Sequence, residues 1–109
     1  MKFSAIPFGT TDWAHVERVE HRGARGSAFW QTCQFGDVRV RMVEYSPGYL
    51  AGHWCVKGHI LLCLGGELQT ELEDGRVFTL TPVVSYQVAD HAESRRSSTG
   101  VGATVFIVD

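Results

Sequence analysis

Alternation of apolar and polar residues is the feature that most limits how this chain can fold. It runs through Glu67–Glu73 and again through Val38–Tyr45. A period of two places successive side chains on opposite faces of a β-strand, whereas a helix repeats its apolar positions every three or four residues. Asp74-Gly75 favours a two-residue turn, and Arg76–Leu80 returns as the partner strand. The sequence therefore predicts an antiparallel hairpin over residues 67–80.

Three more segments have the length and composition of strands. They are the apolar run His59–Leu64, closed by Gly65-Gly66, and the stretches Ser85–Val88 and Ala103–Val108. Short strands joined by tight turns predict an all-β barrel or double-sheet sandwich. A chain of 109 residues has room for one core, so we expect one domain over residues 1–109.

The remaining segments are less regular. Asp12 is placed to cap at most one short helix ending near Val19, and residues 20–26 are typical of a loop. The polar stretch Asp90–Thr99 is also expected to be a loop. The predicted core, which depends on the face that each strand turns inward, consists of Val40, Met42, Ile60, Leu62, Leu64, Leu68, Leu72, Phe78, Leu80, Phe106 and Val108.

Charge and composition exclude several classes of protein. A net charge of -2 with scattered arginines argues against a nucleic-acid partner. The longest apolar run, Ile60–Leu64, is far shorter than the roughly 20 residues of a membrane span. Three cysteines at irregular spacing make no disulfide framework, so we expect a reducing, cytoplasmic setting in which Cys33 and Cys63 are packed thiols.

The residues best suited to chemistry are His53, Cys55 and His59. On an extended chain, positions i and i+2 share a face, so His53 and Cys55 can approach one point, and His59 would join them from a neighbouring strand. Imidazole and thiolate are ligands of zinc, copper, nickel, iron or manganese rather than of calcium or magnesium. We therefore expect one divalent transition metal at these residues, and the spacing does not select which.

The same residues carry a resemblance to the cupin superfamily. A cupin's first motif has the form His-x-His, three or four residues, Glu, six residues, Gly, and this chain has His53-x-Cys55, three residues, His59, six residues, Gly66. Gly75 and Pro82 resemble the second motif. Residues 39–49, 51–59 and 106–109 are similar to small single-domain cupins named for an Asp/His/Cys/Trp motif. The resemblance implies an RmlC-like jelly roll, a site at the barrel mouth and a homodimer, but no reaction.

The chain departs from the cupin pattern at three positions. Gly52 stands in place of the aspartate of the family motif, Val83 in place of the glycine after Pro82, and Arg95 in place of the last histidine ligand. Loss of the aspartate removes a carboxylate that would orient a ligating imidazole. A guanidinium cannot ligate a metal, so Arg95 either repels a cation or binds an anion.

Three functions remain open at this point. The first is a metal-binding cupin of unassigned reaction, and the second is a metal-free module that binds a small acidic metabolite through Arg95. The third is a cupin that has lost its site. Candidates for lining the pocket, beside Arg95, are His91, Gln87, Trp54, Tyr49 and Tyr86.

Overall fold

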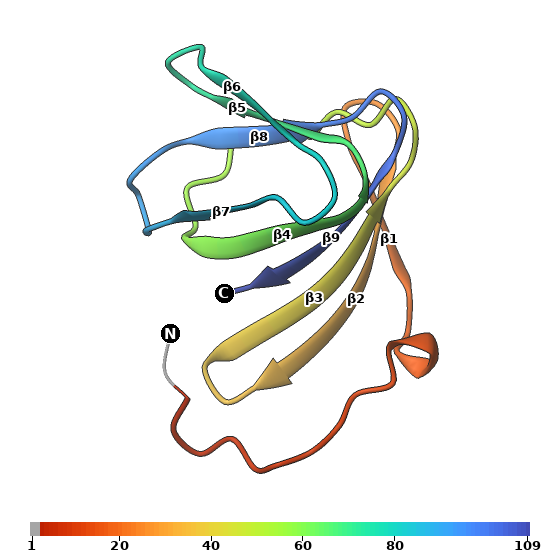
Figure 1. The fold of residues 1–109 in the computed structure, drawn as a ribbon, viewed down its shortest axis with the longest axis vertical. Helices are drawn as coiled ribbons and strands as arrows, with labels where there is room; N and C mark the ends of the chain where they lie inside the picture. Colours follow the sequence, from red (N-terminus) through yellow and green to blue (C-terminus); the bar gives the residue numbers. More distant parts are fainter. Residues whose placement is uncertain (1–2) are drawn as a thin grey trace.

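Two antiparallel sheets face each other across a common interior (Figure 1). The computed structural model describes residues 3–109. The larger sheet has the strand order β1-β2-β3-β9-β4-β7, and the smaller one has the order β6-β5-β8. The strands are β1 Val19–Arg22, β2 Ser27–Phe35, β3 Val38–Tyr45, β4 His59–Gly66, β5 Leu68–Leu72, β6 Val77–Leu80, β7 Ser85–Val88, β8 Arg95–Ser98 and β9 Ala103–Val108.

The strands predicted from alternation are confirmed. β3, β7 and β9 have the predicted bounds, and β4, β5 and β6 lie within two residues of theirs. β5 and β6 pair as the predicted hairpin, with Gly75 at a φ of +99° in the turn. Positive φ at this position suits glycine, which has no Cβ to clash with the backbone.

Two predicted loops are wrong in part. The stretch expected to be a polar loop contains β8, which pairs with β5 from Leu72↔Arg95 to Gln69↔Ser98. The N-terminal region contains β1 and β2 and only a short 3-10 helix, η1, at Trp13–His15, whose first turn is capped by the Asp12 carboxylate. A polar strand such as β8 has no apolar alternation that would reveal it in the sequence. It is extended because it pairs with β5.

The predicted core is correct for the leucines of the small sheet, wrong for Phe78, which is 50% exposed, and shifted by one residue in the large sheet. Leu68, Leu72 and Leu80 are buried as expected. In β3, β4 and β9 the buried side chains are the odd-numbered ones, apart from Val38 at the start of β3. The residues predicted to be inside lie on the outer face, where Ile60 and Leu64 are exposed. Both faces of these strands are apolar, so alternation could not tell the inner face from the outer one. The buried residues of the large sheet include Val43, Tyr45, Leu61, Cys63, Ala103, Val105 and Ile107.

The segment before β4 runs beside β8 and extends the small sheet. Isolated bridges join Leu50 to Ser98 and Cys55 to Arg95, and the Ala51 amide donates to the Ser97 carbonyl at 3.0 Å. Extended pairing turns the odd-numbered residues of this segment to the interior. Among residues 3–109, no helix is long and apolar enough to cross a membrane.

Val83, which stands where the resemblance to the second cupin motif leads us to expect a glycine, has a strained backbone. Its φ is +67°, and the Val84 amide donates to the Thr81 carbonyl at 3.0 Å, which closes a turn with Pro82 and Val83 at its centre. A turn of this kind has positive φ at its third residue and favours glycine there. A β-branched residue in this conformation is an outlier.

We predict that Val83→Gly raises the free energy of unfolding by about 1 kcal/mol, since relief of the left-handed strain exceeds the added chain entropy. The valine side chain is 86% exposed, so little packing is lost. Thermal denaturation should show a rise of about 4 °C or more. Val84→Gly is the matched control, because Val84 is adjacent and has no positive φ, and this change should lower the free energy of unfolding. Equal effects of the two changes would show that Val83 is not strained.

Candidate functional site

The interior holds a cavity of about 200 Å³ between the two sheets. Odd-numbered residues of the segment before β4 form one wall, and β2, β3, β4, β7, β8 and β9 supply the others. The cavity is lined by aromatic residues, by cationic residues and by two histidines. These are Trp30, Tyr45, Tyr49, Tyr86, Arg39, Arg41, Lys57, Arg95, Arg96, His53 and His59, with Ala51, Cys55, Leu61, Ser97, Ile107 and Asp109.

His59 and Tyr86 form the polar centre of the cavity. Their side chains come from paired strands, β4 and β7, and Nε2 of His59 lies 2.7 Å from the Tyr86 hydroxyl. Nη2 of Arg95 lies 3.4 Å from the same Nε2. Because a guanidinium only donates, Nε2 of His59 is the acceptor, and the Tyr86 hydroxyl donates to it as well.

His59 is neutral at physiological pH. Burial lowers its pKa to about 4, and the positive charges of Arg95 and Arg41 act in the same direction. Burial also raises the pKa of Tyr86, against the lowering effect of Arg95, so the hydroxyl keeps its proton. The pair is therefore an uncharged tyrosine–histidine hydrogen bond inside a positively charged environment.

Arg39 and Arg41 share one carboxylate, that of Asp109. Arg39 contacts it through Nη2 at 2.8 Å and Arg41 through Nη2 at 3.3 Å. Arg41 is only 6% exposed, and burial lowers its pKa, with the positive charge of Arg39 adding to the effect. One carboxylate balances two guanidinium charges, so this part of the cavity keeps an excess of positive charge.

Arg95 is 3% exposed and has no carboxylate partner among residues 3–109. Its guanidinium donates instead to main-chain carbonyls: to Glu93 at 2.8 Å, to Cys55 at 3.5 Å and to Lys57. Within the described chain, Nε of Arg95 and Nε of Arg41 are both buried without a hydrogen-bond partner. Two buried guanidinium groups therefore retain donors that an added acceptor would satisfy.

The predicted metal ligands line one cavity without forming a metal site. His53, Cys55 and His59 all line it, as the alternation in the sequence predicted for the first two. In the part of the chain that the structure describes, however, no three histidine, cysteine, aspartate or glutamate side chains are grouped to hold a metal ion. Nε2 of His59 is taken by Tyr86 and faces Arg95. The donor set thus fits a cation poorly, and the metal site stays a prediction.

The other predicted pocket residues have different positions. Tyr49 and Tyr86 line the interior cavity. Trp54 is exposed and does not line this cavity, and the Arg96 guanidinium lies 4.7 Å from its ring centre. His91 is an exposed residue of the loop before β8, with a φ of +61°, and lines none of the cavities described here. Gln87 pairs with Ile60 and does not line the interior cavity, but it lines two neighbouring cavities described below.

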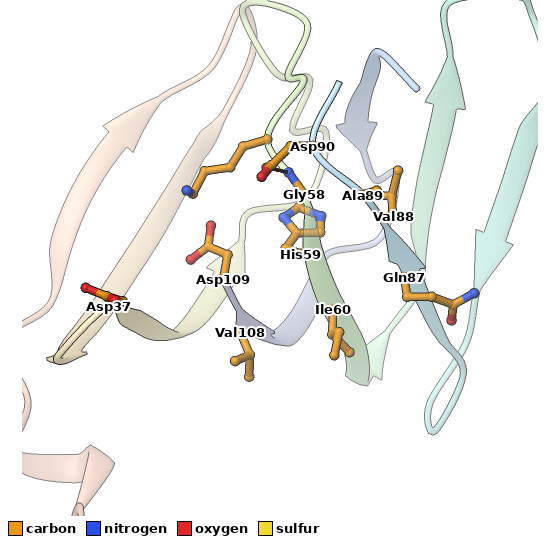
Figure 2. Close-up of a pocket in the computed structure, with 11 residues that line it drawn as sticks. Asp37, Gly58, His59, Ile60, Gln87, Val88, Ala89, Asp90, Val108 and Asp109 are labelled. Carbon is orange, nitrogen blue, oxygen red and sulfur yellow. Dashed lines mark hydrogen bonds between the residues drawn. The ribbon is translucent and has the colours of Figure 1, made fainter. Parts of the chain in front are cut away.

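An open cavity of about 550 Å³ adjoins the interior one where β4 begins and β9 ends. His59, Lys57 and Asp109 line both cavities. Figure 2 shows His59 and Asp109 on one side of the sheet, with Ile60 and Val108 pointing to the other. The Gly58 amide donates to Asp90 at 2.6 Å, which holds the two loops of this opening together.

Sequence reasoning missed Arg41 and Asp109. The signal was present, since Arg39 and Arg41 occupy alternate positions of a strand that was correctly predicted. Charged residues at such positions are normally assigned to the solvent face, and this assignment also reversed the predicted core. Asp109, the partner of both arginines, lies 68 positions away from Arg41 in the sequence, so only the pairing of β3 with β9 brings them together.

Comparisons with known proteins find similarity in structure alone. No protein-family model and no curated protein matches the sequence. Ectoine synthase from P. lautus is similar with a TM-score of 0.75 and 12% identity, over 93% of this chain and 76% of that chain. An RmlC-like cupin from Shewanella frigidimarina has a TM-score of 0.72 and 15% identity, over 95% and 91%. A sugar phosphate isomerase from a cupin superfamily, from Silicibacter pomeroyi, has a TM-score of 0.73 and 14% identity, over 92% and 74%.

We predict that the ring protons of His59, followed by NMR, titrate with a midpoint near pH 4, below the 6.5 of an ordinary histidine. The unfolded chain binds this proton more readily, so the free energy of unfolding should fall as pH drops from 6.5 to 4. The part of that fall due to His59 should be absent in His59→Gln. A midpoint near 6.5, or identical pH profiles of the two proteins, would contradict the assigned environment.

Proposed function

We propose that this chain, which has the cupin fold, binds a small organic acid inside its barrel, with Arg95 and Arg41 as the groups that receive the negative charge. The observation that carries the proposal is the burial of these two guanidinium groups with more positive charge than the described carboxylates balance. The proposal concerns binding, and no reaction is assigned to the site.

The energetics of buried charge support an anionic ligand. A buried charge is costly unless it is paired, and carbonyl dipoles around Arg95 offset only part of that cost. A carboxylate or phosphate in the cavity would accept from Nε of Arg95 or of Arg41, the donors left without a partner in the described residues. Charge-assisted hydrogen bonds of this kind are the strong ones.

The same charges disfavour a metal cation. Of the residues that line the interior cavity, five are arginine or lysine and one, Asp109, is acidic. Repulsion between a divalent ion and nearby guanidinium groups is strong where the surroundings exclude water. The metal-binding cupin expected from His53, Cys55 and His59 is therefore the weaker proposal. A cupin that has lost its site would account for Gly52 but not for the Nε donors of Arg95 and Arg41, which are buried without a hydrogen-bond partner in the described chain.

We predict that NMR titration with succinate and with inorganic phosphate shows saturable binding that Arg95→Gln and Arg41→Gln each weaken at least tenfold. The loss of one charged hydrogen-bond donor is worth about 1.5–3 kcal/mol. Arg18→Gln is the matched control, because Arg18 pairs with Glu44 on the exposed surface, away from the cavity. An anion beside Arg95 should also raise the pKa of His59, which a purely structural arginine would not produce.

Several outcomes would overturn the proposal. Absence of binding by every acid, or equal binding by the Arg18 and Arg95 variants, would exclude the site. Circular dichroism checks that Arg95→Gln folds, and Arg95→Lys, which keeps the charge, provides a second variant if it does not. Elemental analysis after expression with zinc, nickel, iron and manganese tests the alternative: metal retained by the wild type and lost in His53→Ala would favour the metal-binding cupin. The predicted homodimer is tested separately by light scattering.

A further inference from the structure

We infer that the acid bound at Arg95 is a monocarboxylic acid with an apolar body of about six carbon atoms, which lies in a side cavity between β6 and β7. This inference deepens the proposed function and rests on it. The side cavity, of about 280 Å³, is lined by Thr70, Leu72, Phe78, Tyr86, Gln87, Val88, Glu93 and Arg95.

The side cavity lies where the two sheets leave a gap in the barrel. β6 is one of the two edge strands of the small sheet and β7 one of those of the large sheet, and each contributes to the walls. Tyr86 and Arg95 line both this cavity and the interior one. The guanidinium at the centre of the proposed anion site is thus also part of the side cavity.

The inner end of the side cavity offers two donors. Thr70 and Arg95 are each 3% exposed, and in the described chain Oγ1 of Thr70 and Nε of Arg95 have no hydrogen-bond partner. Tyr86 lines the same cavity, and burial raises the pKa of its hydroxyl. A carboxylate has two acceptor oxygens and would satisfy a guanidinium N–H and a hydroxyl together.

The remaining wall is mainly apolar and selects the rest of the ligand. Leu72 is buried, Val88 is half-buried and the Phe78 side chain is 50% exposed at the edge of β6. An apolar chain or ring placed against them would be removed from water, whereas the hydroxyls of a sugar would lose their hydration there. An apolar cavity of about 150 Å³ holds benzene, so the observed volume accommodates a phenyl ring or a six-carbon chain.

Glu93 limits the ligand to one negative charge. Glu93 lines the same cavity, and its carboxylate pairs with Arg76 at 3.2 Å near the surface. A second carboxylate at the far end of the ligand would approach this group and be repelled. A dicarboxylic acid of the same length should therefore bind more weakly in the side cavity than the monocarboxylic acid.

The test is an NMR titration of the full chain with acetate, butyrate and hexanoate, following the backbone amides and the Nε–H of Arg95. We expect the affinity to rise about fourfold per methylene group, the value for full burial, with hexanoate shifting the amides of β6 and β7. Phe78→Ala should remove most of that gain and leave acetate binding unchanged. Val77→Ala, on the same strand but outside the cavity, is the matched control and should have no effect.

Thr70→Val provides a variant that separates binding from folding. The described chain gives Oγ1 of Thr70 no partner, so replacing the hydroxyl by a methyl group should leave the melting temperature unchanged or raised. The same change should weaken every carboxylate in the series about fivefold or more. A Thr70→Val protein that binds acetate and hexanoate as the wild type does would overturn the placement of the carboxylate.

The outcomes distinguish this inference from the proposed function. If acetate binds in an Arg95-dependent way and hexanoate binds no more tightly, the side cavity is not used and the anion site stands. If succinate and phosphate bind at Arg95 and no monocarboxylate does, the ligand class is wrong and the anion site again stands. If no acid of either kind binds, the proposed function fails and the inference fails with it.

Discussion

The arrangement of the site depends on the hydrogen bonds that the Arg95 guanidinium donates to the main chain. They reach the carbonyls of Cys55, Lys57 and Glu93, and the Cys55–Arg95 bridge adds two backbone hydrogen bonds. Together they hold the segment before β4 against β8, and thereby place His53 and Cys55 on the cavity wall. Where the cupin pattern has a histidine ligand, this chain has a residue that builds the wall and brings a positive charge to it.

That charge adds to the effect of burial on its neighbours. Burial lowers the pKa of His59, the adjacent Arg95 charge lowers it further, and the neutral ring accepts the Tyr86 hydrogen bond. Arg41 shares the Asp109 carboxylate with Arg39, so its guanidinium adds further positive charge to the cavity. The outcome is an interior in which two histidines lie among more cationic than acidic side chains.

The two faces of the large sheet explain why part of the core prediction was wrong. β3, β4 and β9 have apolar residues on both faces, and the inner face of β3 also carries Arg39 and Arg41. Hydrophobicity alone therefore assigned the wrong set of alternate residues to the interior. β5 has charged or amide side chains on its outer face and leucines on its inner face, so its inner face could be predicted from the sequence.

The sequence by itself determined the all-β class, the β5–β6 hairpin, six of the strands and the spacing of His53, Cys55 and His59, because these depend on local alternation and on turn residues. Tertiary structure alone decided which face of each strand is inside, that the polar segment Arg95–Ser98 is a strand, and which carboxylate meets which guanidinium. The reason is physical. Burial of a charge and the pairing of a polar strand depend on partners far away in the chain, and no local pattern encodes their positions.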